Sequence, residues 1–149
     1  MKTIAIGCDP NAQTRKELII EHVKSLGYEV KDFGSEDPIY ANVAIAVAEA
    51  VANKEYERGI LICGTGIGVC IAANKVDGAY AALCSDVYSA ERAQLSNNAN
   101  IMTMGAFTTG SEVAKLMVTT YLGASYVSGG RSEPKVQRIC DYEKNPAGK

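Results

Sequence analysis

Short apolar runs that alternate with amphipathic stretches are the feature of this sequence that most restricts its fold. Five runs have the length and residue types of buried strands, and we expect strands at residues 3–7, 28–33, 59–63, 79–84 and 100–104. Apolar residues at helical spacing predict helices over residues 13–26, 40–53, 67–75, 86–97, 111–122 and 133–144. This alternation predicts an α/β fold with a Rossmann-like, doubly wound sheet of five parallel strands.

A single domain is expected to span residues 1–149. The hydrophobic fraction of 47% is enough for one core, and no linker or repeat divides the chain. Residues 123–131, which include two adjacent glycines, form the one expected hinge, and they set the last helix apart from the main body. A detached helix in so small a protein usually packs on a neighbouring subunit, so we expect at least a homodimer.

Charge and composition exclude several kinds of partner. The formal net charge is −2 and no basic run is long, so we expect neither nucleic acid nor a membrane surface as a partner. No apolar stretch reaches the roughly 18 residues of a membrane span, and the first residues are typical of a strand rather than a leader. Five cysteines without a CxxC pair indicate reduced thiols, not a zinc site or a disulfide framework, so we expect a cytoplasmic protein.

The stretch after the third expected strand is the best candidate for a functional loop. It consists of Cys63, Gly64, Thr65, Gly66, Ile67 and Gly68. Open parallel sheets bind ligands beyond the carboxyl ends of their strands. The glycines leave backbone N–H groups exposed where a helix begins, and such groups hold a phosphate or an oxyanion that develops during a reaction. The glycine spacing matches neither a dinucleotide fingerprint nor a P-loop.

Four side chains near this edge of the sheet are candidates for chemistry. Cys63 points at a helix N-terminus, which favours the thiolate and lets it act as a base, although a buried core cysteine fits the position as well. Thr65 can relay a proton or hold a hydroxyl. Asp9 can bind a substrate hydroxyl or act as a second acid or base, or it can cap a turn. Tyr40 opens the second helix and is a candidate ligand contact.

Several motifs in matching order and spacing resemble the ribose-5-phosphate isomerase B family, which also contains the galactose-6-phosphate isomerase subunits. The motifs are GCD (7–9), ICGTGIG (62–68), AANKV (72–76), YSA (88–90), NNAN (97–100) and GGR (129–131). The resemblance covers residues 2–140. It implies a dimer or tetramer that needs no metal or cofactor and interconverts aldose and ketose phosphates through a cis-enediol.

The same resemblance implies a role for individual residues. Cys63 would move a proton between C1 and C2 of the sugar, and Thr65 would handle the hydroxyl proton. The backbone amides of residues 64–68 would stabilise the enediolate. The implied substrate contacts are Asp9 and Asn97 for hydroxyls and Arg131 for the phosphate. The resemblance also implies that the site is shared across the dimer interface.

Four positions depart from the pattern of the family. Pro10 replaces a histidine, Phe107 replaces a phosphate-binding arginine, and Lys135 replaces a second arginine, so that Lys135 would bind phosphate as a point charge. Ser96 stands where many members have the histidine that opens the sugar ring, and Ser96 remains a candidate substrate contact. A four-carbon sugar phosphate with its phosphate on O4 closes no furanose, so its isomerase needs no such histidine.

The segments around Ser96 and Tyr40 also resemble the branch of this family used in erythritol catabolism. That branch interconverts D-erythrulose 4-phosphate and D-erythrose 4-phosphate, and we expect this activity. Three alternatives stay open. They are a ribose-5-phosphate isomerase, one subunit of a two-chain hexose-phosphate isomerase, and a phosphosugar-binding module without catalysis.

Overall fold

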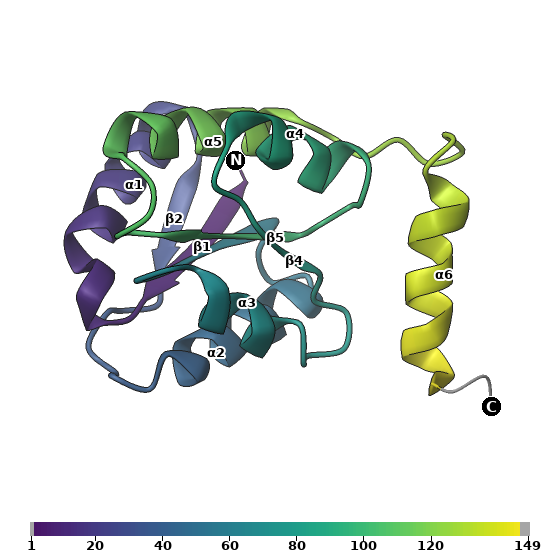
Figure 1. The fold of residues 1–149 in the computed structure, drawn as a ribbon, viewed down its shortest axis with the longest axis horizontal. Coiled ribbons are helices and arrows are strands. Elements are labelled where there is room, and N and C mark those ends of the chain that lie inside the picture. Colours follow the sequence, from purple (N-terminus) through teal and green to yellow (C-terminus); the bar gives the residue numbers. More distant parts are fainter. Residues whose placement is uncertain (1, 147–149) are drawn as a thin grey trace.

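The five expected strands form one parallel sheet in the order β2-β1-β3-β5-β4 (Figure 1). The computed structural model describes residues 2–146. The strands are β1 (Thr3–Cys8), β2 (Glu29–Asp32), β3 (Arg58–Cys63), β4 (Ala81–Leu83) and β5 (Ile101–Gly105). Every residue of β3 and β5 is buried, because both strands lie inside the sheet and both of their faces are covered. The doubly wound α/β architecture predicted from the sequence is therefore confirmed.

The described residues contain six α-helices, of which the first five cover the sheet. They are α1 (Gln13–Ser25), α2 (Tyr40–Ala52), α3 (Ile67–Ala73), α4 (Val87–Leu95), α5 (Ser111–Gly123) and α6 (Glu133–Lys144). Helices α1, α4 and α5 lie on one face, and α2 and α3 lie on the other (Figure 1). A short 3-10 turn, η1 (Pro10–Ala12), precedes α1. Between residues 2 and 146, no helix has the length and apolar character needed to cross a membrane.

Two expected helices, α3 and α4, end two residues earlier than their apolar spacing predicts. Helix α4 stops at Leu95 because the side chain of Asn97 donates to the Arg92 carbonyl and Asn98 takes a positive φ of 51°. Helix α3 stops at Ala73, since the Asn74 amide pairs with the backbone of β4 instead. Local side-chain bonds to the backbone thus set both ends, and hydrophobic periodicity does not report them.

The core is divided by the sheet into two halves. Alternate residues of a strand point to opposite faces, so Ile60 and Ile62 pack under α1, α4 and α5. Leu61 and Cys63 point the other way and pack with the buried residues of α2 and α3. Cys63 therefore reaches its site from the α2–α3 side of the sheet.

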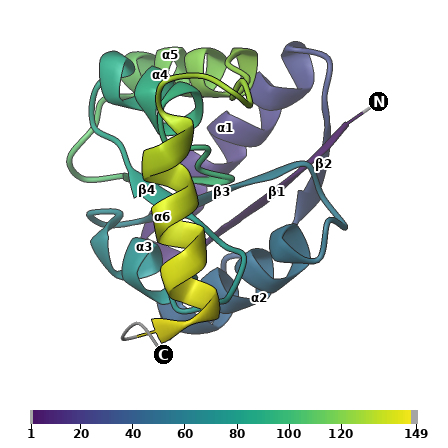
Figure 2. The same cartoon turned by 90° about the vertical axis from the view of Figure 1, so that its right-hand side faces the viewer.

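Helix α6 stands beside the body and buries none of its residues within the chain (Figures 1 and 2). Near its end, Glu143 accepts hydrogen bonds from the Tyr80 hydroxyl at 2.6 Å and the Gly78 N–H at 3.0 Å. A pocket of about 280 Å³ lies between α6 and the body. The separation of this helix agrees with the hinge predicted at residues 123–131, while its packing on a neighbouring subunit stays a prediction.

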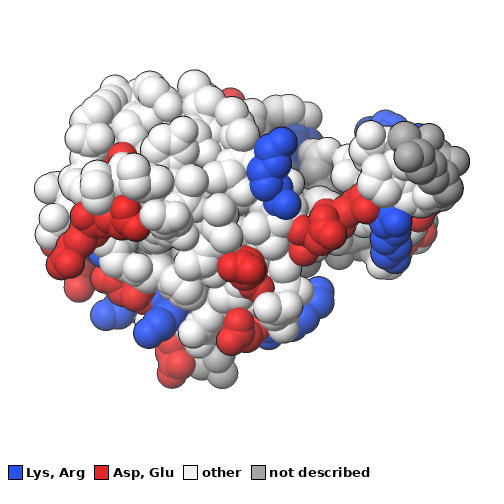
Figure 3. Space-filling view, turned by 90° about the horizontal axis from the view of Figure 1, so that it is seen from below, with Lys and Arg blue, Asp and Glu red and all other residues white. Residues whose placement is uncertain are grey.

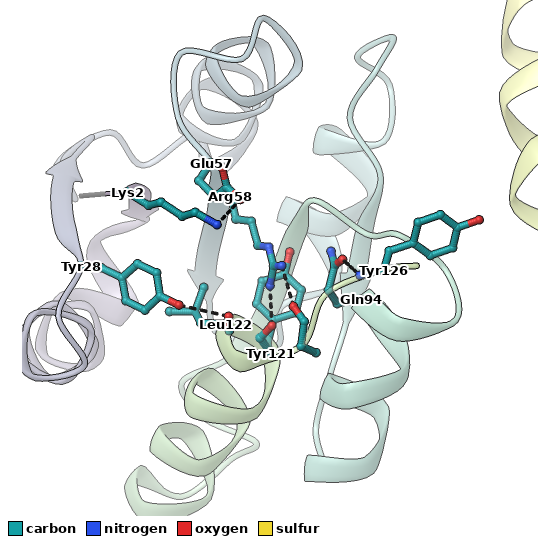
Figure 4. A network of polar contacts seen from close by, with 9 residues as sticks. Lys2, Tyr28, Glu57, Arg58, Gln94, Tyr121, Leu122 and Tyr126 are labelled. Atoms are coloured by element: carbon teal, nitrogen blue, oxygen red, sulfur yellow. Dashed lines mark hydrogen bonds and ion pairs between the residues drawn. The ribbon is translucent and has the colours of Figure 1, made fainter. Parts of the chain in front are cut away.

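A buried arginine fastens the end of the sheet that lies opposite the strand carboxyl ends (Figure 4). Arg58 begins β3 and donates to the carbonyl oxygens of Tyr121 and Ala124, and its guanidinium lies 5.1 Å from the centre of the Tyr121 ring. The Tyr28 hydroxyl donates to the Leu122 carbonyl at 3.1 Å beside it. Together these bonds satisfy the last carbonyls of α5, which have no partner inside the helix.

Arg58→Met is expected to lower the free energy of unfolding by about 3 kcal/mol, because two buried carbonyls lose a charged donor. Urea denaturation monitored by circular dichroism measures the change. Lys24→Met removes an exposed cation from α1 and should change stability by less than about 0.5 kcal/mol. Equal stability of the two variants would contradict the anchoring role of Arg58.

Candidate active site

Three strand ends bring the candidate residues together at one edge of the sheet. Cys63 ends β3 and lies opposite Gly105, the last residue of β5. Asp9 follows β1, and its N–H donates to the Ile62 carbonyl at 3.4 Å. Because neighbouring parallel strands share a register, Cys63 and Asp9 are placed at this edge as the sequence predicted.

Gly66 makes the turn from β3 into α3. Its φ of +79° lies in the left-handed region, and a Cβ at this position would lie 2.6 Å from the carbonyl carbon of Met104. The Thr103 hydroxyl donates to the Gly66 carbonyl at 2.8 Å and fixes the turn from β5. Only glycine satisfies both the backbone conformation and this close approach.

The turn directs a backbone donor at the sulfur of Cys63. The Gly66 N–H donates to Cys63 Sγ at 3.1 Å. Burial raises the pKa of Cys8 to about 12 and that of Cys84 to about 12, so these thiols stay protonated at neutral pH. Of these three cysteines, Cys63 is the one whose sulfur accepts a backbone N–H. In the part of the chain described, no three histidine, cysteine or acidic side chains gather to hold a metal ion.

Some backbone N–H groups of the loop donate within the loop, and others have no acceptor there. The Ile67 N–H donates to Thr65 Oγ1 at 3.2 Å, which leaves the Thr65 hydroxyl proton free for a substrate oxygen. The N–H groups of Gly66 and Ile67 are therefore already engaged. Within residues 2–146, those of Gly64, Thr65 and Gly68 have no acceptor, and they remain for an oxyanion.

Two aromatic rings flank this loop because two of its glycines leave room for them. The Tyr40 ring packs directly against Gly68, and a Cβ at Gly64 would lie 3.0 Å from the ring of Phe107. Phe107 is 71% exposed, and its N–H donates to the Gly64 carbonyl at 2.9 Å. Tyr40 therefore lies beside the loop as predicted, and Phe107 forms its opposite wall.

Buried polar atoms without partners gather at the same edge. The Asp9 carboxylate is 6% exposed, and only its Oδ2 has a donor, the Asn11 amide at 3.3 Å. Asp9 Oδ1, Arg15 Nη1 and Thr109 Oγ1 are buried without a partner among residues 2–146. Each such atom costs about 1–3 kcal/mol unless a ligand or water completes it. Asp9 is thus equipped to bind a hydroxyl.

Sequence reasoning did not single out Arg15 and Thr109. Their positions in the fold could have suggested them as ligand contacts. Arg15 lies in the first turn of the helix after β1, and Thr109 lies in the loop after β5. Both places are at the carboxyl edge of the sheet, where polar residues serve ligands.

The remaining candidates lie elsewhere in the same chain. Ser96 and Asn97 follow α4 and precede β5, so the whole length of β5 separates them from Cys63. The Ser96 hydroxyl accepts from Arg92 Nη1 at 3.1 Å. Arg131 and Lys135 are exposed at the start of α6, beyond the hinge. One chain therefore holds two separate groups of candidate residues.

The first of these groups has the parts needed for proton transfer beside a carbonyl. A cysteine with a donated N–H can act as the base, and free amides beside it can hold an enediolate. A buried carboxylate with one free oxygen can hold a sugar hydroxyl. On a doubly wound sheet, this arrangement defines a class of protein, the α/β isomerases of small carbonyl compounds.

Comparison with known proteins identifies the family within this class. A family model described as Ribose/Galactose Isomerase matches residues 4–139. A D-erythrulose-4-phosphate isomerase from Pectobacterium atrosepticum is 46% identical over 96% of each chain. A ribose-5-P isomerase B from Listeria innocua is 49% identical and covers 95% of this chain and 97% of its own. The solved ribose-5-phosphate isomerase B from Clostridium thermocellum superposes with a TM-score of 0.89 at 41% identity, over 95% of this chain and 97% of its own.

The chain therefore belongs to the ribose/galactose isomerase family, as its motifs predicted. It is an enzyme that interconverts the aldose and ketose forms of a phosphorylated sugar.

Gly66→Ala is expected to lower isomerase turnover at least about 100-fold, because a Cβ would push the turn off Met104 and move the N–H away from Cys63. The melting temperature should fall as well, since the left-handed conformation disfavours alanine. Gly123→Ala is the matched control, because a Cβ there meets nothing within 4 Å. Full turnover in Gly66→Ala would show that the turn geometry is not needed.

Proposed function

We propose that this enzyme interconverts D-erythrulose 4-phosphate and D-erythrose 4-phosphate, as in erythritol catabolism. The observation that carries the proposal is the hydrogen bond made by Ser96, which stands where the family resemblance places a ring-opening histidine. Its hydroxyl accepts a hydrogen bond from the Arg92 guanidinium, which has no basic atom. This pair cannot take up a proton from a cyclic sugar, so the substrate must already be open.

The single histidine of the chain does not replace the missing group. His22 lies in the last turn of α1, and its Nε2 is 2.7 Å from the hydroxyl of Thr119 on α5. This position is at the far end of α1 from Asp9 and Cys63. The absence of an imidazole at the site favours a sugar too short to form a furanose over a pentose phosphate.

The proposed reaction uses the residues at the carboxyl edge in sequence. The Cys63 thiolate removes the proton from C1 of the ketose, and the electron pair moves into the C1–C2 bond while charge develops on O2. The free amides of Gly64, Thr65 and Gly68 stabilise that oxyanion. The Thr65 hydroxyl passes the proton from O1 to O2, and the Cys63 thiol returns its proton to C2. Asp9 Oδ1 accepts a hydrogen bond from a substrate hydroxyl during the whole reaction.

The relatives support a phosphorylated sugar and differ in its length. The Pectobacterium relative is named for the four-carbon reaction, and the Listeria relative is named for ribose 5-phosphate. Ribose 5-phosphate is therefore the second candidate substrate. Ser96, Pro10 and Phe107 favour the shorter sugar, because the groups that the family uses to open a ring and hold a more distant phosphate are replaced.

We also propose that a second copy of the chain completes the site, so the functional unit is a homodimer or homotetramer. Asn97, Arg131 and Lys135 would then reach Cys63 of the neighbouring copy. The surface supports association: Ile67 and Ile71 of α3 are 50% and 59% exposed. In Figure 3, which views the α2–α3 side, charged side chains lie mainly around the rim of a broad uncharged area. Exposed apolar side chains such as these two isoleucines are typical of an interface.

The substrate assignment is tested by kinetics on both sugars. The purified enzyme is expected to show a kcat/KM at least about tenfold higher for D-erythrulose 4-phosphate than for D-ribose 5-phosphate, because the cyclic sugar must open before it reacts. Ser96→His should raise the value for ribose 5-phosphate. Ser25→His, on the exposed end of α1, should not. A preference of the wild-type enzyme for the pentose would refute the proposal.

Cys63→Ala is expected to lower kcat by about 10²–10⁴-fold with either sugar, the usual contribution of a positioned base. Arg131→Ala should also have little isomerase activity, because the substrate phosphate loses a ligand. If sites are shared, mixing the two inactive proteins restores about a quarter of wild-type activity, since half of randomly paired dimers are mixed and each holds one intact site. No recovery, after subunit exchange is verified by mass spectrometry, would contradict the shared site.

A further inference from the structure

Arg15 is a cation at the carboxyl edge of the sheet that none of the roles above uses. It lies in the first turn of α1, and its Nη2 donates to the Thr109 carbonyl at 2.7 Å. Its Nη1 is buried and has no partner among residues 2–146. A guanidinium with an unused buried donor is a strong site for an anion, because each of its donors is fixed in direction.

Thr109 provides a second unused donor at the same place. Its side chain is 7% exposed, and its Oγ1 has no partner in the described chain. Thr109 immediately precedes Gly110, the N-cap of the 13-residue helix α5, and no side chain of residues 2–146 caps that helix. The first N–H groups of α5 lack intrahelical acceptors and favour an anion.

The acidic residue in the first turn of α5 does not oppose an anion there. Glu112 pairs with Lys115 at 3.4 Å, and its side chain is 85% exposed. Its charge is thus directed to solvent and partly neutralised.

This pair of donors lies one loop away from the reacting end of the site. Gly105 is opposite Cys63 in the sheet register, and the Thr109 N–H donates to the Gly105 carbonyl at 3.2 Å. The loop between them carries Phe107, which offers no charge to a phosphate. Arg15 reaches the end of this loop from α1 and brings to it a positive charge that the loop itself lacks.

We propose that Arg15 and Thr109, together with the N-terminus of α5, bind the phosphate group of the substrate. This inference rests on the proposed function, since it takes the anion to be the phosphorylated end of the sugar bound at Cys63. Phosphate oxygens accept from Arg15 Nη1 and from the Thr109 hydroxyl, so both buried donors gain a partner. Both atoms are closed to solvent in the free chain, so phosphate binding requires a local shift of residues 106–110 that keeps Thr109 near Arg15.

The site adds a phosphate ligand from the chain that provides Cys63. Arg131 and Lys135 lie beyond the hinge and are proposed to come from the neighbouring copy. Arg15 and Thr109 need no second subunit, because α1 and the loop before α5 belong to the same body as β3.

The test uses inorganic phosphate as the probe and measures the change in melting temperature that it causes. Sodium chloride keeps the ionic strength constant. We expect 10 mM phosphate to raise the melting temperature of the wild-type protein and of Cys63→Ser. Arg15→Gln should lose most of the shift, since only Arg131 and Lys135 of the neighbouring copy then remain for the phosphate. Lys24→Gln, on the exposed end of the same helix, should keep the full shift. If Arg15→Gln does not fold, Arg15→Lys keeps the charge, loses the fixed pair of donors, and should show a reduced shift.

Thr109→Val separates binding from a structural role. If Thr109 is only structural, removing a buried hydroxyl without a partner should leave phosphate binding unchanged and stabilise the free protein. If it binds phosphate, the shift should shrink and KM for the sugar phosphate should rise about tenfold, with little change in kcat.

Two results would overturn the inference: no phosphate shift in the wild-type protein, or a shift of wild-type size in Arg15→Gln. The proposed function fails separately. A protein that binds phosphate through Arg15 but does not isomerise D-erythrulose 4-phosphate would refute the substrate and leave this site standing.

Discussion

The conformation of Gly66 is the constraint on which the rest of the site depends. Its left-handed φ turns the chain out of β3 within three residues of Cys63, and this turn directs an N–H at the sulfur. The Thr103 hydroxyl fixes the Gly66 carbonyl, so β5 positions the turn as well as the strand before it. A side chain at residue 66 would strike the backbone of Met104. Base and oxyanion donors are therefore set by the backbone, which is more rigid than any side chain.

The arrangement of strands and helices was predictable because burial imposes it. Central strands such as β3 are covered on both faces and read as continuous apolar runs, while α2 and α5 each bury one stripe. Helix ends were less predictable, since Asn74 and Asn97 stop α3 and α4 through side-chain bonds to the backbone. Such bonds depend on which neighbours the fold supplies, and a hydrophobic pattern contains no information about them.

The position of several candidate site residues was predictable for a similar reason. Cys63, Thr65 and Asp9 lie directly at strand ends, and a parallel sheet brings those ends to one edge. Arg15 and Thr109 were missed because they are joined by a bond between a side chain and a carbonyl 94 residues away, which no local pattern reports. Asn97 and Arg131 are a third case: only the family resemblance suggested them, and one folded chain keeps them away from Cys63.

The exchange of histidine for serine at residue 96 also changes the electrostatics of the region. An imidazole can take up and pass a proton near pH 7, whereas the Arg92 guanidinium that donates to Ser96 has no basic atom. Arg92 also pairs with Glu91 at 3.2 Å, so its charge is partly neutralised, and neither Ser96 nor Arg92 provides a proton shuttle. A serine that accepts from a guanidinium does not catalyse the opening of a sugar ring. Under the proposed function, this pair of side chains omits the chemistry that only a cyclic substrate requires.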